Sequence, residues 1–240
     1  MRWVAGFAAA TFGLTSMALA EEPWSFEPLI SATFAEPTAR YAHGVLGDDI
    51  EYGALILQYA PKNARYIIRL PQDRVFEDIA PRLVDIDADG QQEVMVVESQ
   101  TNTGARLALY NGAGLIAATP HIGTRNRWLA PLGAADLDGD GHMEIAYIDR
   151  PHLAKTLRVW RFKDGTLSEI ASLPGLTNHK NGWAFIPGGI RVCDGQPEVI
   201  LANANWSRII AATLNAGQIL TRDIGAYTNP DSLNAALSCS

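Results

Sequence analysis

The sequence has few cysteines, no excess of basic residues and, after its first twenty residues, no long apolar run. Two cysteines in 240 residues exclude a dense disulfide scaffold and a zinc site built from several cysteines. Lysine and arginine number 19 against 26 aspartates and glutamates, and the net charge of -7 argues against a nucleic-acid binder and against adhesion to an anionic membrane. Hydrophobic residues make up 48% of the chain, enough for a substantial core.

The first twenty residues have the features of a signal peptide. Arg2 precedes an apolar, uncharged run, and Ala18 and Ala20 place small residues at the -3 and -1 positions of a cleavage site before Glu21. An uncleaved anchor is the alternative, but the run is shorter than the roughly 20 residues that a spanning helix needs. We therefore expect residues 21–240 to be exported, either secreted or periplasmic, with no membrane span after cleavage.

Export changes the expectation for the two cysteines, because oxidising compartments favour disulfides. A bond between Cys193 and Cys239 would close a loop of 46 residues and tie down the C-terminal end of the chain. In the chain-entropy model such a bond stabilises the fold by roughly 4 kcal/mol. Two free thiols, one of them on a frayed tail, are the alternative.

An acidic segment followed by an apolar run recurs along the chain. The glutamates that open the apolar runs are Glu93, Glu144 and Glu198, which are 51 and 54 residues apart. A repeat of this length is typical of arrays of small structural units. The copies begin, in order of decreasing similarity, at Leu83, Ala134, Ile190 and Val45.

Each of the three clearer copies continues with two further alternating runs separated by a glycine-containing tetrapeptide, which is a hairpin signal. These tetrapeptides begin at Asn111, Lys163 and Asn215. None of the runs keeps a helical period over ten or more residues, so we predict three or four short antiparallel strands per repeat.

A unit of about 50 residues with four strands cannot bury both of its faces alone, and stacking units around an axis buries them. We therefore predict an all-β fold, a small β-propeller of four blades of antiparallel strands, or five if the chain ends form one jointly. A possible strand within residues 21–40 would pair with the last unit and close the ring. A two-sheet β-sandwich is the alternative. The expected repeats lie near residues 41–82, 83–133, 134–189 and 190–240.

The two complete acidic segments have the pattern of a calcium loop. Carboxylates at positions 1, 3, 5 and 9, with no basic residue between them, repel one another, and a calcium ion that accepts six to eight oxygens would remove that repulsion. Gly90 and Gly141 occupy position 6, where a sharp turn can demand a positive φ. The predicted ligands of two calcium sites are Asp85, Asp87, Asp89 and Glu93 in one loop and Asp136, Asp138, Asp140 and Glu144 in the other, with backbone carbonyls of Gln91 and His142 at position 7.

An EF-hand shares the first half of this pattern but needs an acid at position 12 and a following helix. Position 12 here is Val96 or Tyr147, each inside an apolar run that is typical of a strand. A solvated acidic turn, in which the aspartates form Asx turns, is the remaining alternative.

The other two copies are incomplete. Ile190 and Val192 occupy the first two ligand positions of the third copy, so we expect no metal there and a disulfide at Cys193 as the local staple. The earliest copy, at residues 48–51, also lacks a full ligand set.

The pattern DxDxDGxxE leading into a strand, repeated about every 50 residues in an exported chain, resembles the FG-GAP/VCBS repeat family, whose integrin-type members are calcium-binding β-propellers. The resemblance extends roughly from Tyr41 to Ile224 and is strongest at Asp85–Val97 and Asp136–Ile148. It implies a propeller with structural calcium loops and a surface that binds proteins or glycans. The chain is too short for the seven blades of integrin-type members.

No catalytic motif stands out. The sequence has no GxSxG elbow, and no metal-ligand spacing relates the five histidines, which are His43, His121, His142, His152 and His179. We therefore expect a non-catalytic binding or scaffold protein with a protein or glycan ligand. A secreted hydrolase or a carbohydrate-recognising accessory protein on the same propeller is the alternative.

Two further features bear on a ligand site. Four tryptophans could stack on sugars, but two of them recur at the same place in the repeat, which favours the core; the four are Trp128, Trp160, Trp183 and Trp206, and the recurring pair is Trp128 and Trp183. The polar segment at residues 42–49, AHGVLGDD, has no assigned role and would fit either a turn or a site near the propeller axis.

Overall fold

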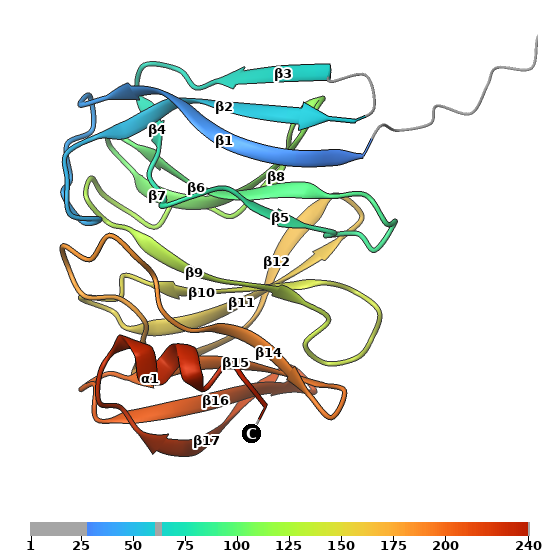
Figure 1. Ribbon diagram of the computed structural model, residues 1–240, viewed down its shortest axis with the longest axis vertical. Helices are drawn as coiled ribbons and strands as arrows, with labels where there is room; N and C mark the ends of the chain where they lie inside the picture. The colour runs from blue at the N-terminus through green and yellow to red at the C-terminus, as the bar shows by residue number, and fades with distance from the viewer. Residues whose placement is uncertain (1–27, 61–63, 240) are drawn as a thin grey trace, which may run out of the picture.

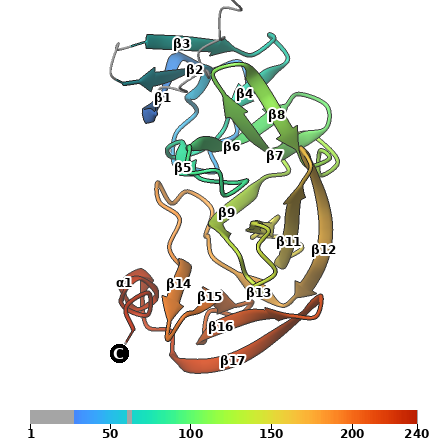
Figure 2. The same ribbon diagram turned by 90° about the vertical axis from the view of Figure 1, so that its right-hand side faces the viewer.

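The computed structural model describes residues 28–60 and 64–239, which form an all-β chain built from antiparallel sheets. The proposed signal peptide lies outside the described residues. Three sheets are stacked along the long axis of the molecule (Figure 1), and in a view turned by 90° they follow a curve rather than a flat stack (Figure 2). The arrangement is consistent with a β-propeller-like fold.

The first sheet joins eight strands, in the order β1-β2-β4-β6-β7-β8, with β3 beside β2 and β5 beside β6. The strands are β1 Leu29–Thr38, β2 Glu51–Tyr59, β3 Ala64–Arg69, β4 Arg74–Phe76, β5 Arg82–Val84, β6 Glu93–Gln100, β7 Gly104–Asn111 and β8 Gly114–Ala118.

The second and third sheets are smaller. The second has the order β12-β11-β10-β9, and the third has the order β13-β15-β16-β17 with β14 also paired to β15. Their strands are β9 Leu129–Ala135, β10 Glu144–Asp149, β11 Thr156–Lys163, β12 Thr166–Pro174, β13 Leu176–Thr177, β14 Gly189–Cys193, β15 Gln196–Asn203, β16 Arg208–Asn215 and β17 Gln218–Ala226. One short helix, α1 Pro230–Ala235, follows the last strand.

The first described strand does not close a ring. The expectation that it pairs with the last unit is wrong, because β1 pairs along its length with β2, with Phe34 opposite Leu55. The ring of Phe34 stacks on Tyr52 and Phe76, which ties β1 to the apolar core of the first sheet. In Figure 1 this strand and the C-terminal sheet lie at opposite ends of the long axis.

The predicted hairpins are confirmed. Turns at the three predicted tetrapeptides join β7 to β8, β11 to β12 and β16 to β17. Asp164 and Gly165 in the second hairpin both have positive φ, 50° and 73°, as a two-residue turn that matches strand twist requires.

The acidic loops connect neighbouring strands of a sheet. Glu144 at the end of one loop stands opposite Ala135 just before it, so β9 and β10 pair on either side of residues 136–144. The first loop, residues 85–93, joins β5 to β6 in the same way. Antiparallel pairing places both loops and all three hairpins at one end of the sheets, on the right in Figure 1. We call this the acidic end, and the other the opposite end.

Apolar side chains between the sheets form the core. Strands β6 and β10 are buried over almost their whole length, because neighbouring strands and sheets cover both of their faces. Met95 and Leu107 of the first sheet pack with Ile145 of the second, and Ile148 of the second packs with Leu201 of the third. Two of the core clusters thus join neighbouring sheets, so stacking buries apolar faces that a single sheet would leave exposed.

Candidate metal centres

The two acidic loops share one backbone conformation. The carboxylate of Asp85 accepts a hydrogen bond from the N–H of Gly90 at 3.1 Å, and that of Asp136 accepts one from Gly141 at 3.0 Å. Both glycines have a φ of 86°, a left-handed conformation that glycine adopts without steric cost. The curl of the loop thus folds position 6 back onto position 1.

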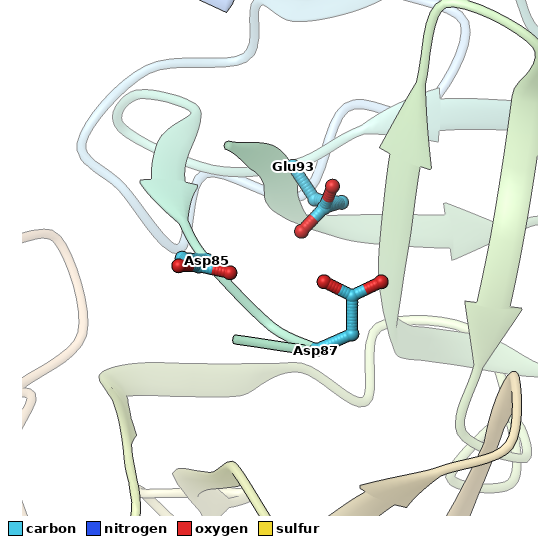
Figure 3. A group of neighbouring side chains, drawn as sticks. All are labelled: Asp85, Asp87 and Glu93. Carbon is cyan, nitrogen blue, oxygen red and sulfur yellow. The ribbon is translucent and has the colours of Figure 1, made fainter. Parts of the chain in front are cut away.

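Three carboxylates converge in each loop. One oxygen from each of Asp85, Asp87 and Glu93 lies within 4.8 Å of the other two, and Figure 3 shows the three side chains pointing toward one another. The equivalent group in the second loop is Asp136, Asp138 and Glu144. Such groups could hold a metal ion, and an all-oxygen donor set suits a hard cation.

One buried oxygen in each group fits that interpretation. Oδ1 of Asp85 and Oδ1 of Asp138 are buried and have no hydrogen-bond partner within the described residues. A buried, unpaired carboxylate oxygen is costly, and a cation would satisfy it.

The aspartates at position 5 form local turns. Oδ1 of Asp89 accepts a hydrogen bond from the N–H of Gln91 at 2.7 Å, and Oδ1 of Asp140 accepts one from His142 at 2.9 Å. These are Asx turns, and neither aspartate belongs to the converging group of three. The structure therefore brings together positions 1, 3 and 9 of the predicted ligand set.

The position 9 glutamates are the buried members. Oε2 of Glu93 accepts a hydrogen bond from the N–H of Ile86, and Oε2 of Glu144 accepts one from Leu137. Burial, with Asp87 and Asp89 nearby, raises the pKa of Glu93 to about 7. Burial also raises the pKa of Glu144, so loss of solvation is the main cause in both loops.

The second loop already contains a cation, because the Arg161 guanidinium from β11 enters it. Its nitrogens lie 2.6 Å from Glu144, 2.6 Å from Asp138 and 2.8 Å from Asp140. No basic side chain makes an ion pair with a carboxylate of the first loop in the part of the chain that the structure describes. Sequence reasoning missed Arg161, and only the pairing of Glu144 with Arg161 across the two strands could have revealed it.

The third copy has no acidic loop. Asp194 and Gly195, with φ of 52° and 77°, form a two-residue turn between β14 and β15. Burial raises the pKa of Glu198, but bonds from Arg191 and Arg222 outweigh it and hold that pKa below its usual value.

The third and the earliest copies, which lack a complete acidic loop, have other features in its place. A disulfide joins Cys193, beside the third turn, to Cys239. In the earliest copy, Glu51 is buried at the start of β2, where burial and the neighbouring Glu77 raise its pKa to about 9.

The tryptophans divide into two groups. Trp128 and Trp160 are buried in the core, as predicted, whereas Trp183 and Trp206 are only half-buried, so the core prediction is wrong for this pair. The two half-buried rings lie 5.4 Å apart at the opposite end, where Trp183 belongs to the long connection between β13 and β14 and Trp206 to the turn between β15 and β16. Phe185 stacks on Trp183, and Tyr227 contacts Trp206.

A lysine completes this surface. Nζ of Lys180 lies over the rings of Trp183, Trp206 and Tyr227, at 5.4, 4.8 and 5.8 Å from their centroids. We call the group of Lys180, Trp183, Phe185, Trp206 and Tyr227 the aromatic platform.

Comparison with known protein families agrees with this geometry. The fold and the loops define an all-β repeat protein with acidic loops between strands. Residues 85–147 match the model of the FG-GAP-like repeat, so the chain contains such a repeat, spanning both complete loops. The resemblance drawn from the sequence is thereby confirmed.

Among solved structures, the exotype rhamnogalacturonan lyase YesX is similar over 70% of this chain, with 15% sequence identity and a TM-score of 0.42. The chain spans 40% of the length of that lyase. No curated protein matches the sequence. None of the helices within the described residues has the length and apolar character needed to cross a membrane.

Proposed function

We propose that this chain is an exported β-propeller-like protein of four units that binds calcium in its acidic loops and a protein or glycan at its surface, without catalysing a reaction. The observations that carry the proposal are the convergence of Asp85, Asp87 and Glu93 and the buried Oδ1 of Asp85, which has no hydrogen-bond partner among the described residues. Calcium suits this set because it accepts many oxygen ligands in a flexible geometry.

The role proposed for calcium is structural. Each loop connects two neighbouring strands, so neutralising its carboxylates removes repulsion at the point where the strands begin to pair. The first loop is the stronger of the two proposed sites. Its carboxylates have no cationic partner among the described residues, whereas Arg161 already neutralises part of the second loop.

Thermal unfolding of residues 21–240 in millimolar calcium and in chelator tests this proposal. Calcium at about 100 times its Kd stabilises the folded state by about 2.7 kcal/mol. The double variant Asp85→Asn/Asp87→Asn should lose most of the calcium-dependent rise in melting temperature. The double variant Asp136→Asn/Asp138→Asn should lose less of it. Asp194→Asn, in the third turn, is the matched control and should keep the shift. A melting temperature that responds to neither calcium nor chelator would contradict the metal assignment.

A glycan ligand is favoured by the aromatic platform. Half-buried tryptophan and tyrosine rings offer flat apolar faces with polar edges, which suit the mixed surface of a sugar. The substitutions Trp183→Ala and Trp206→Ala should abolish binding on a glycan array while leaving the calcium-dependent melting unchanged. Turnover of a glycan or ester panel that persists after chelation would instead favour a secreted hydrolase.

A further inference from the structure

A pocket outside the acidic loops lies at the opposite end of the sheets. It has a volume of about 30 Å³, and its lining includes His43, Asn126, Arg127, Arg150 and His152. His43 belongs to the polar segment that the sequence left without a role. The residues come from three separate connections between strands, so the site exists only in the folded chain.

A buried carboxylate orients His43. Glu77, in the break between β4 and β5, is fully buried and contacts Nδ1 of His43 through Oε1. The hydroxyl of Ser99 donates to Oε2 of the same glutamate, and Nε1 of Trp128 donates to its backbone carbonyl at 2.9 Å. A carboxylate on Nδ1 fixes the ring and leaves Nε2 for a further partner.

A second hydrogen-bond chain orients His152. Nε2 of His179 lies 2.9 Å from the backbone carbonyl of Trp183 and must donate to it. Burial lowers the pKa of His179 to about 4, so this ring is neutral and its Nδ1 accepts from Nε2 of His152 at 3.0 Å. His152 therefore keeps Nδ1 as an acceptor, and the chain connects the pocket to the aromatic platform.

Three acids near the pocket each contact a basic side chain. Glu77 contacts His43, Asp78 pairs with Arg82 at 2.6 Å, and Asp149 pairs with both Arg150 at 2.7 Å and Arg158 at 2.9 Å.

The arginines therefore dominate the charge at the pocket. The guanidinium of Arg127 makes no ion pair or side-chain hydrogen bond within residues 28–60 and 64–239. Arg150 and Arg158 share the carboxylate of Asp149, and Arg158 also pairs with Glu169 at 2.6 Å. The residues that line the pocket include Arg127 and Arg150 and no acidic side chain, so the lining itself is positively charged.

The backbone around the pocket is held in place. Asn126 and Arg150 have φ of 60° and 46°, a conformation that non-glycine residues seldom adopt. The N–H of Asn126 donates to the hydroxyl of Tyr41 at 2.8 Å, and the N–H of Arg150 donates to the carbonyl of Trp128 at 3.0 Å. Binding would therefore require little ordering of these connections.

We propose that this pocket binds the oxyanion group of a small ligand, a carboxylate or sulfate, through Arg127 and Arg150, with the imidazolium form of His43 donating from Nε2. His152, whose Nδ1 is an acceptor, lies beside the bound group and does not contact it through a hydrogen bond. Arginine presents paired N–H donors that match the geometry of such groups. The volume accommodates one charged group, and the rest of a larger ligand would extend toward the aromatic platform. The proposed anion site does not depend on calcium. Only the version in which the anionic group belongs to an acidic sugar rests on the proposed glycan binding.

An NMR titration of the ¹⁵N-histidine-labelled protein, with calcium present throughout, tests this inference. The probes are sulfate, glucuronate and glucose, at constant ionic strength set with sodium chloride, and the readout is the ring resonances of the five histidines. We expect saturable shifts at His43 and His152 with both anions, and none at His121 or His142. Arg127→Gln should weaken anion binding at least tenfold, and Arg127→Lys should retain part of it.

Arg65→Gln on β3 removes the same charge far from the pocket and should leave anion binding unchanged. If glucuronate binds more tightly than sulfate, and Trp183→Ala removes this difference in affinity, the result would support the site and assign it to an acidic sugar. Equal binding of the two anions would support a site for free anions. Three results would overturn the inference. They are an absence of saturable shifts at His43 and His152, an equal loss of anion affinity in Arg127→Gln and Arg65→Gln, and equal binding of glucose and glucuronate. The calcium-dependent melting of Arg127→Gln should stay intact, which separates this outcome from failure of the calcium sites.

Discussion

The two acidic loops have the same backbone but different charge partners. In both, position 1 accepts a hydrogen bond from the glycine at position 6, and positions 1, 3 and 9 converge. The second loop contains Arg161, whereas the first has no basic partner among the described residues. The repeat therefore specifies the shape of the loop, while the neighbouring strand determines how its charge is balanced.

The third copy extends the comparison. Its turn is only two residues long, its glutamate pairs with two arginines, and a disulfide lies beside it. Three copies at similar spacing thus stabilise the entry to the following strand in three ways. The first has converging carboxylates for which we propose a cation from solution, the second has a built-in arginine, and the third has arginines and a covalent bond.

The disulfide gives the largest expected effect. Cys193→Ser/Cys239→Ser should lower the free energy of unfolding by about 4 kcal/mol, because the bond closes a loop of 46 residues. The loss should be equal in calcium and in chelator, since the third turn has no converging carboxylates. Urea unfolding under both conditions measures it, and a loss that depends on calcium would contradict the separation of the third turn from the loops.

Replacing the built-in cation should convert the second loop into one like the first. Arg161→Gln leaves the buried Glu144 unpaired, so we expect a loss of about 2 kcal/mol in chelator and a smaller loss in calcium. The control is Arg208→Gln, which breaks an exposed ion pair with Asp223 and should change little. Chemical denaturation measures the free energy of unfolding in calcium and in chelator. If Arg161→Gln lowers it equally in both conditions, calcium does not substitute for the guanidinium.

The earliest copy differs from the complete loops by holding a buried, protonated glutamate. The pKa of Glu51 is about 9 in the folded state against an ordinary value of 4.5, so unfolding releases a proton at neutral pH. Stability should therefore fall as the pH rises from about 4.5 toward 9. Glu51→Gln should remove this loss and stabilise the protein by at least about 1 kcal/mol at pH 8, with no gain at pH 4. Glu36→Gln on the exposed face of β1 is the control, and a gain that is independent of pH would refute the cause.

The smallest expected effect concerns position 4 of the loops. Ala88 has a φ of 60°, and the second loop has Gly139 there with a φ of 76°. Ala88→Gly should therefore stabilise the first loop by about 0.5 kcal/mol, and Gly139→Ala should destabilise the second by about 1 kcal/mol. A Cβ at Gly139 meets no atom within 4 Å, so the backbone alone sets this cost. Changes of the same sign in the two variants would show that the loops differ in backbone after all.

Local features of this fold could be read from the sequence, because they depend on residues close together in the chain. The alternating runs and glycine turns specify the hairpins, and the aspartate spacing specifies the curled loops. The same spacing also permits the Asx turns that Asp89 and Asp140 form, so the sequence alone does not show which of the acids converge.

Features that depend on distant residues could not be predicted in this way. Arg161 meets its loop only through strand pairing, and β1 joins β2 because Phe34 packs on the core of the first sheet. The histidine pocket assembles from connections far apart in the sequence, so no spacing reveals it. Trp183 lies in the long connection between β13 and β14, and Trp206 lies in the turn between β15 and β16, so no local pattern predicts that the two half-buried rings meet.

Anomalous diffraction from crystals grown in millimolar calcium would show whether the first loop binds the ion. We expect a calcium ion about 2.3–2.6 Å from carboxylate oxygens of Asp85, Asp87 and Glu93. A first loop without an anomalous peak, and with these three carboxylates turned away from one another, would contradict it.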